Sequence, residues 1–446
     1  MKTNSDEMHN QEMLLKKIRQ SSEVFDKLAN SYEVWVPESG WLAGRRNRDK
    51  NDSKRKYLDD WTMLSFVFEI DNCHYPMADS YLQYGIDGVI RIAAETLETL
   101  QNNLQSKLQD QTQLDIAYLE SLLHVWKRFR QFVADHMVLA LESAKQETSD
   151  TKKKRYEKIA KICQNVTINK PNTFCEALQL FWFTYLFRSP FGAGCIGRLD
   201  QLLYPFYKHD CEMGIWDQQE AEKMLEEMFT RMNEINTGDT LRNLMLSGQD
   251  AKGNDQTNEI TYLILVAYEN TGGSEPHLNV RFHEKTPKKL RDNCINMLSS
   301  GSGQPTIYFD EAVLPAMEKA GICHEDACQY ANDGCTETVI AGKSAIVFWQ
   351  YEMVKTVELT LFGGNENPCV KPVSMKKNSI HGADFVPKTN LLIGIESKKP
   401  QELTTFSEFL SAFFEQMDHQ LDHYFLMIKQ KMQEDQTVSI TSPFTA

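Results

Sequence analysis

The pattern of apolar and polar positions divides the chain near residue 160. Before that point apolar residues recur at steps of three or four, the period of helices with one buried face. The basic stretch 151–158 is expected to be a connector to a second helical stretch, residues 177–187. Those residues are apolar on nearly all sides, which predicts a buried helix, with Asn172 or Thr173 as a candidate N-cap.

From about residue 240 the period changes, and short strand-like runs alternate with longer helical ones. The clearest strand is 277–283, in which apolar and polar residues alternate. Strands that alternate with helices are typical of an α/β fold with a largely parallel sheet. The predicted strands are 243–248, 277–283 and 305–309, and the predicted helices are 259–268, 287–299, 311–320, 347–361 and 406–430.

Composition and charge exclude several classes of protein. The chain has 446 residues, of which 41% are hydrophobic and 25% charged, so it can build a sizeable core. Lys and Arg number 48 against 62 Asp and Glu, and the resulting net charge of −14 disfavours nucleic-acid binding. There is no apolar run of membrane-spanning length and no signal-like N-terminus, and the 10 cysteines form no regular framework. We therefore expect a cytoplasmic protein with no membrane partner.

The first candidate for chemistry is the run Gly334-Cys335-Thr336-Glu337, between two predicted helices. Glycine permits a tight turn that presents the thiol at a loop tip, and Glu337 can act as a general acid or base beside it. A buried structural cysteine is the stronger interpretation of these local residues taken alone, because free cysteines are mostly buried.

Three further candidates also have ordinary structural explanations. Arg198 and Asp200 can form an ion pair at a helix start or clamp a substrate, and His74 can be a lone structural histidine. His419 and His423 have the i, i+4 spacing of a zinc helix, but the intervening residues lack the metalloprotease glutamate and no third ligand is indicated. We expect no metal site.

Several segments, taken in order along the chain, resemble glycyl radical enzymes of the pyruvate formate-lyase-like family. The cysteine loop resembles the Gly-Cys-x-Glu signature of that family. The resemblance runs from about Gly40 to the C-terminus and includes segments 74–79, 84–88, 174–179, 197–214, 246–250, 258–263 and 276–286.

The resemblance implies an α/β barrel of ten strands in two halves, with the cysteine on a loop inside it. Residues 1–160 would be the helical N-terminal region, and residues 161–446 the part of the barrel that carries the cysteine loop. Cys335 would form a thiyl radical and Glu337 would be the acid or base. A glycyl radical, installed by a radical-SAM iron–sulfur activating enzyme, would start the chemistry, with no other stably bound cofactor.

Two departures from the family bear on the reaction. Pyruvate formate-lyases proper have two adjacent cysteines, whereas here Gly334 precedes Cys335, which disfavours acyl transfer. Diol dehydratases of the family have a His-Ser pair and a later acid where this chain has Gly192-Ala193 and Trp349. The resemblance therefore favours a lyase, dehydratase or decarboxylase with a small-molecule substrate, bound by His74, Arg198, Asp200 and Trp349 in a more apolar pocket.

A third departure is that no glycine after Cys335 has the surroundings of the family's radical glycine. We therefore expect a truncated chain with an incomplete half barrel, completed by a second polypeptide or by self-association. The alternatives are a formate C-acetyltransferase-like protein and a catalytically inactive remnant that serves as a binding subunit.

Overall fold

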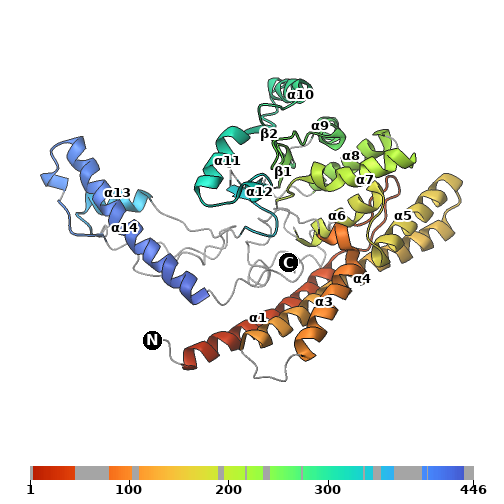
Figure 1. The fold of residues 1–446 in the computed structure, drawn as a ribbon, viewed down its shortest axis with the longest axis horizontal. Coiled ribbons are helices and arrows are strands. Elements are labelled where there is room, and N and C mark those ends of the chain that lie inside the picture. The colour runs from red at the N-terminus through yellow and green to blue at the C-terminus, as the bar shows by residue number, and fades with distance from the viewer. Residues whose placement is uncertain are drawn as a thin grey trace. The chain divides into compact units, whose positions relative to one another are not determined.

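The computed structural model describes most of the chain as helices joined to two small sheets (Figure 1). The described residues are 4–45, 80–102, 110–188, 195–215, 218–234, 242–272, 275–334, 337–344, 353–365, 394–398 and 400–435. They fall into two compact units, one within residues 1–346 and one within residues 347–440. No described helix is both long enough and apolar enough to cross a membrane.

The N-terminal part of the first unit is helical, as the sequence predicts. Helix α4 packs against α1, α3 and α5, and α6 packs against α5. Thr173 is the N-cap of α6: its Oγ1 accepts a hydrogen bond from the Glu176 backbone, and Glu176 Oε2 accepts one from the Thr173 backbone. Among the described residues the helices of this part are α1 (Asn4–Ser31), α3 (Ser80–Asn102), α4 (Asp110–Gln146), α5 (Asp150–Ile168) and α6 (Phe174–Arg188).

The expected connector at residues 151–158 is wrong, because these residues lie within α5. Lys and Arg have good helix propensity, and their side chains are compatible with an exposed helix face. Tyr156, Ile159, Cys163 and Val166 are buried at helical spacing on the other face. The basic run is the solvated start of a helix whose later turns are anchored in the core.

A buried histidine in α4, His136, has a pKa well below its usual value. His136 is fully buried between the Phe132 and Phe183 rings; its Nδ1 donates to the Phe132 carbonyl at 2.8 Å, and Nε2 has no partner among the described residues. Burial lowers the pKa of His136 from 6.5 to about 4, since the charged ring would lose its hydration. The folded protein therefore holds His136 neutral at neutral pH.

We expect the protein to lose stability as the pH falls from 6.5 towards 4. In that window the unfolded chain takes up a proton at His136 and the folded chain does not, so the loss reaches about 2 kcal/mol at pH 5. Urea unfolding at pH 7 and pH 5 measures it, with His136→Gln as the comparison. An equal pH dependence in the wild type and the variant would contradict the assignment.

The later part of the first unit is the predicted α/β region. Strands β1 (Asn243–Ser247), β2 (His277–Phe282) and β3 (Thr306–Phe309) form a parallel sheet in that order. Residues 195–197 extend it beside β1: Ile196 N donates to Asn243 O, and Met245 N donates to Gly197 O. The helices are α7 (Leu199–Met213), α8 (Gln218–Glu234), α9 (Glu259–Thr271), α10 (Lys288–Ser299), α11 (Asp310–Lys319) and α12 (His324–Ala327).

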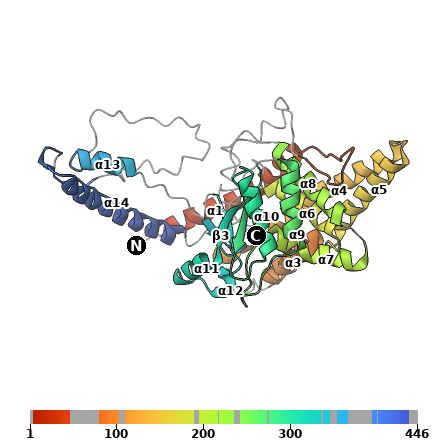
Figure 2. The ribbon, with the colours of Figure 1, turned by 90° about the horizontal axis from the view of Figure 1, so that it is seen from above.

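Helices α9 and α10 connect successive parallel strands, and α9 lies beside α8 (Figure 2). A hairpin of β4 (Ala331–Asp333) and β5 (Glu337–Val339) follows, and β4 contacts β1. The prediction of an α/β chain with a parallel sheet is confirmed. The described residues contain only these two small sheets and no closed barrel.

The described elements of the second unit are α13 (Met353–Leu361), a short 3₁₀ turn (Pro400–Glu402) and α14 (Phe406–Asp435). Buried polar groups join its parts. Thr356 Oγ1 donates to Gln420 Oε1 at 2.7 Å between α13 and α14, and the Gln416 amide exchanges two hydrogen bonds with the Ile395 backbone.

Candidate active site

The β4–β5 hairpin brings together the residues on either side of Cys335. The last paired residues of its ladder are Asp333 and Glu337, and Gly334 directly follows the first of them. Gly334 has a φ of +50°, the left-handed region that glycine adopts most readily. A Cβ atom at Gly334 would lie 2.8 Å from Oε2 of Glu337. The Glu337 carboxylate therefore folds back over the residue that precedes Cys335.

Buried asparagines tie the hairpin to the sheet. Asn243, the first residue of β1, donates from Nδ2 to the Gly334 carbonyl at 2.9 Å. Its Oδ1 accepts from Asn332 Nδ2 at 3.0 Å and from Asn279 Nδ2 at 3.2 Å. Cys195 Sγ also contacts the Asn332 carbonyl, at 3.1 Å. The hairpin tip is thus held at the amino end of β1.

Arg198 lies at the other end of β1. Its Nη2 donates to the Ser247 carbonyl at 2.9 Å, and its Nη1 lies 3.3 Å from the Cys328 carbonyl and 3.2 Å from Gln329 Oε1. Burial, together with the nearby Arg281 guanidinium, lowers the pKa of Arg198 to about 10, so the side chain stays charged at neutral pH. Nε is buried without a partner among the described residues.

A cavity of about 530 Å³ opens beside Arg198. Ala331 and Ile340 contribute to it from the base of the hairpin, and Lys343 and Asp326 pair at 2.6 Å among its lining residues. The rest of the lining comes mainly from α3 and α7: Leu82, Gln83, Gln201, Leu202, Pro205 and Phe206. Because Asn243 and Ser247 are four residues apart on one strand, the Gly334 contact and the Arg198 contact lie about 13 Å apart along β1.

Asp200 is completely buried and does not line this cavity. Its Oδ2 accepts from Ser247 N and from Thr261 Oγ1, both at 2.8 Å, and its Oδ1 accepts from Gln201 N. Burial raises the pKa of Asp200, while the Arg198 charge and these hydrogen bonds oppose the shift. These contacts show Asp200 joining the end of β1 to the starts of α7 and α9.

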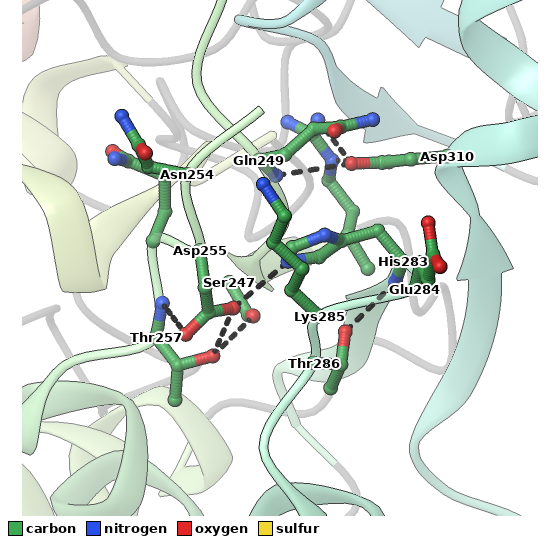
Figure 3. Close-up of polar contacts among 12 residues, drawn as sticks. Ser247, Gln249, Asn254, Asp255, Thr257, His283, Glu284, Lys285, Thr286 and Asp310 are labelled. Atoms are coloured by element: carbon green, nitrogen blue, oxygen red, sulfur yellow. Dashed lines mark hydrogen bonds and ion pairs between the residues drawn. The ribbon is translucent and has the colours of Figure 1, made fainter. Parts of the chain in front are cut away.

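A second polar network covers the carboxyl ends of the three parallel strands (Figure 3). His283 Nε2 lies 2.9 Å from Asp255 Oδ1, which also accepts from Thr257 Oγ1; Thr257 Oγ1 in turn lies 2.8 Å from Ser247 Oγ. Ser247 has a φ of +62°, a strained conformation that these bonds help to hold. Asp310, directly after β3, accepts from Gln249 N.

Arg281 connects that network to the hairpin. Its Nε and Nη2 form a fully buried two-point ion pair with Asp310, each at 2.8 Å. Its Nη1 donates to the Cys328 carbonyl at 2.9 Å, and its guanidinium lies 4.0 Å from the centre of the Tyr330 ring. Four residues of these networks are not among the predicted site residues: Asn243, Asn279, Arg281 and Asp310. The signal that could have indicated them is a polar residue within an otherwise apolar strand or directly after it.

Three predicted site residues, His74, Cys335 and Trp349, lie outside the described residues. His419 and His423 lie on α14 with ring centroids 6.1 Å apart. Among the described residues no group of three His, Cys, Asp or Glu side chains is placed to hold a metal ion.

The comparisons with known proteins point to one family. The sequence profile described as "Pyruvate formate lyase-like" matches residues 66–437. Trans-4-hydroxy-L-proline dehydratase from Clostridioides difficile is 32% identical over 301 residues, which are 64% of this chain and 36% of that protein. Isethionate sulfite-lyase from Oleidesulfovibrio alaskensis is 28% identical over 333 residues, 69% of this chain and 37% of that protein.

Solved structures agree. Hydroxyproline dehydratase from Clostridioides difficile, with trans-4-hydroxy-L-proline bound, has a TM-score of 0.68 at 26% identity, covering 84% of this chain and 47% of that one. The B12-independent glycerol dehydratase from Clostridium butyricum, at 22% identity, shows the same fold with a TM-score of 0.71, covering 92% of this chain and 58% of that one.

The chain spans somewhat more than a third of the length of these curated relatives. The profile match nevertheless covers most of the chain, including helices α3 to α14, the parallel strands and the β4–β5 hairpin. The chain belongs to the pyruvate formate lyase-like family of glycyl radical enzymes.

Proposed function

We propose that this chain is the thiyl-bearing part of a radical dehydratase or lyase that eliminates a group from a small hydroxylated molecule. The observation that carries the proposal is the position of the Glu337 carboxylate, which lies over Gly334, the residue before Cys335. A carboxylate beside a thiol supplies the proton transfer that an elimination needs.

In this proposal the family's radical glycine, on a segment outside these residues, removes the hydrogen atom from the Cys335 thiol. Cys335 then takes a hydrogen atom from a substrate carbon: an S–H bond forms and a C–H bond breaks. The neighbouring C–O bond breaks and the hydroxyl leaves as water. The product radical recovers a hydrogen atom from Cys335, so the substrate is converted to product plus water.

Glu337 serves as the acid or base of this sequence. A leaving hydroxyl needs a proton, and a hydroxyl or amine group on the radical carbon releases one as the C=O or C=N bond forms. One carboxyl group can do both in turn, because it gives one proton and takes one back. The closeness of Glu337 to the tip makes it the described side chain best suited to this task.

The same geometry argues against acyl transfer. A second cysteine at position 334 would bring its Cβ to 2.8 Å from Glu337 Oε2, on a backbone at φ +50°. Any side chain there would be strained and would displace the carboxylate. Gly334 is thus suited to a mechanism that uses one cysteine and one carboxylate, and the formate C-acetyltransferase-like alternative is disfavoured.

The remaining site residues divide into contact and positioning side chains. We propose that His74 and Trp349 contact the substrate. Arg198, charged and bordering the cavity, would attract polar substrate groups, whereas Asp200 positions the end of β1. The whole protein would form the family's ten-stranded barrel, with β1–β3 as part of its wall, and would need a radical-SAM activating enzyme as a partner.

Anaerobic turnover tests the proposal. This chain is combined with a glycyl radical segment of the family and an activating enzyme. It is then offered hydroxylated compounds that appear in the names of its relatives and structural neighbours: trans-4-hydroxy-L-proline, (2S)-3-sulfopropanediol and glycerol. We expect elimination from at least one hydroxylated compound. A full glycyl radical signal by electron paramagnetic resonance (EPR), with no compound consumed, would contradict the proposed reaction class.

A further inference from the structure

His277 is the first residue of β2 and the register partner of Asn243 on β1. Their Cα atoms are therefore about 5 Å apart, the spacing of neighbouring strands. Asn243 Nδ2 donates to the Gly334 carbonyl, and the Glu337 carboxylate lies over Gly334. His277 is thus the neighbour, in the sheet, of the residue that contacts the hairpin beside the Glu337 carboxylate.

The His277 side chain lies on the face of the sheet that carries the β4–β5 hairpin, because residues two apart along a strand point to the same face. Asn279 Nδ2 donates to Asn243 Oδ1 at 3.2 Å. Arg281 Nη1 donates to the Cys328 carbonyl, at the base of the hairpin, at 2.9 Å. The intervening residues of β2 belong to the apolar core on the other face. His277 therefore shares the hairpin face with Asn279 and Arg281.

The polar cluster on this face has unused hydrogen-bonding capacity. Asn243, Asn279 and Asn332 are 1–3% exposed and are joined through Asn243 Oδ1. Asn332 Oδ1, however, is shielded from solvent and has no hydrogen-bond partner among the described residues. A buried acceptor of this kind is stabilised when a donor reaches it. His277 is only half-buried, so a small molecule at this cluster can contact its side chain.

The His277 ring is neutral at neutral pH, because burial lowers its pKa below the usual value of 6.5. A neutral imidazole has one N–H donor and one nitrogen acceptor, and a hydroxyl group can donate as well as accept. The two groups can therefore pair in either direction. An uncharged partner suits a hydroxyl group, whereas a carboxylate or sulfonate would favour a charged one.

We propose that His277 contacts the substrate and binds one of its hydroxyl groups on the hairpin face of the sheet, near Glu337. This inference rests on the proposed function for the identity of the ligand as a hydroxylated molecule, whereas the place of the imidazole is a feature of the sheet itself. The two side chains have different tasks: Glu337 exchanges the proton, and His277 holds the hydroxyl group.

The first test is the rate at which diethyl pyrocarbonate modifies His277, measured by site-resolved mass spectrometry on the wild-type chain without the radical. The probes are the three compounds of the turnover test: trans-4-hydroxy-L-proline, (2S)-3-sulfopropanediol and glycerol. We expect at least one of them to slow the modification about tenfold at a concentration of about ten times its Kd. His124, exposed on α4, is the internal standard and should react at an unchanged rate. An unchanged His277 rate with all three probes would overturn the proposal.

Substitution of His277 tests the same contact through turnover. His277→Phe keeps a ring but has no hydrogen-bonding nitrogen, so KM should rise about tenfold, as the loss of one hydrogen bond would. His277→Gln retains a donor and an acceptor, and its KM should stay within about threefold of the wild type. The matched control, His124→Phe, should leave KM unchanged. A wild-type KM in His277→Phe, or an equal rise in His277→Gln, would overturn the contact.

These outcomes separate the inference from the proposed function. Protection of His277 by a probe, in a protein that carries the radical but consumes no compound, would leave the contact standing and refute the reaction. Turnover of a hydroxylated compound with a wild-type KM in His277→Phe would refute the contact and leave the reaction standing. If His277→Phe fails to fold, the protection experiment on the wild type still decides the question.

Discussion

Replacing Glu337 by glutamine lowers the turnover of the activated protein by about 10²- to 10⁴-fold, the usual contribution of a positioned acid or base. Glutamine keeps the size of the side chain and its place over Gly334, but it neither takes up nor releases the proton. We expect the effect in kcat, with KM changed little, since the carboxylate acts in the bond-breaking step. Steady-state kinetics under anaerobic conditions measure it.

The matched control is Glu325→Gln, which removes a carboxylate from an exposed position on α12 in the same unit. Its turnover should equal that of the wild type. A Glu337→Gln protein that carries the glycyl radical and turns over at the wild-type rate would show that another group handles the proton.

Breaking the Arg281–Asp310 pair should produce the largest loss of stability. Both side chains are wholly buried, and Arg281 also holds the carbonyls of Cys328 and Tyr330 at the base of the hairpin. Asp310→Ala leaves the guanidinium charge buried without its carboxylate, which costs about 3–5 kcal/mol. Urea unfolding followed by circular dichroism measures the loss.

Two further variants show whether the loss comes from the unpaired charge. Asp292→Ala breaks the Lys288–Asp292 contact, which is exposed and joins residues four apart in α10, and should cost less than about 0.5 kcal/mol. The double variant Arg281→Met, Asp310→Leu removes both charges and should recover part of the lost stability. A loss below about 1 kcal/mol in Asp310→Ala would mean that water or rearrangement compensates the buried charge.

The sequence predicts the parallel strands and their helices closely because short strand-like runs alternate with longer helical ones in this part of the chain. Strand β2 alternates apolar and polar residues, α9 follows β1, and α10 follows β2. The prediction of a connector at the start of α5 is wrong because the first residues of this helix are charged, and its buried face begins only at Tyr156. Local charge does not show which face of a helix packs on the core.

The candidate site was predictable only in part. Gly334, Cys335 and Glu337 lie within four consecutive positions, so the sequence alone indicates that they belong to one site. The partners that hold the tip are far apart along it: Asn243 meets Gly334 across 91 positions, and Arg281 meets Cys328 across 47. A three-residue strand such as β4, with Asn332 and Asp333 among its members, has too few residues to show any period. Such contacts follow from tertiary packing.

The most direct measurement compares the wild type with Cys335→Ala in the activated, glycyl-complemented protein. The glycyl radical is quantified by EPR and the product by mass spectrometry in the same sample. We expect the radical signal in both proteins and product in the wild type alone, because the thiol that takes hydrogen from the substrate is missing from the variant. Product formation by Cys335→Ala at the wild-type rate per glycyl radical would contradict it.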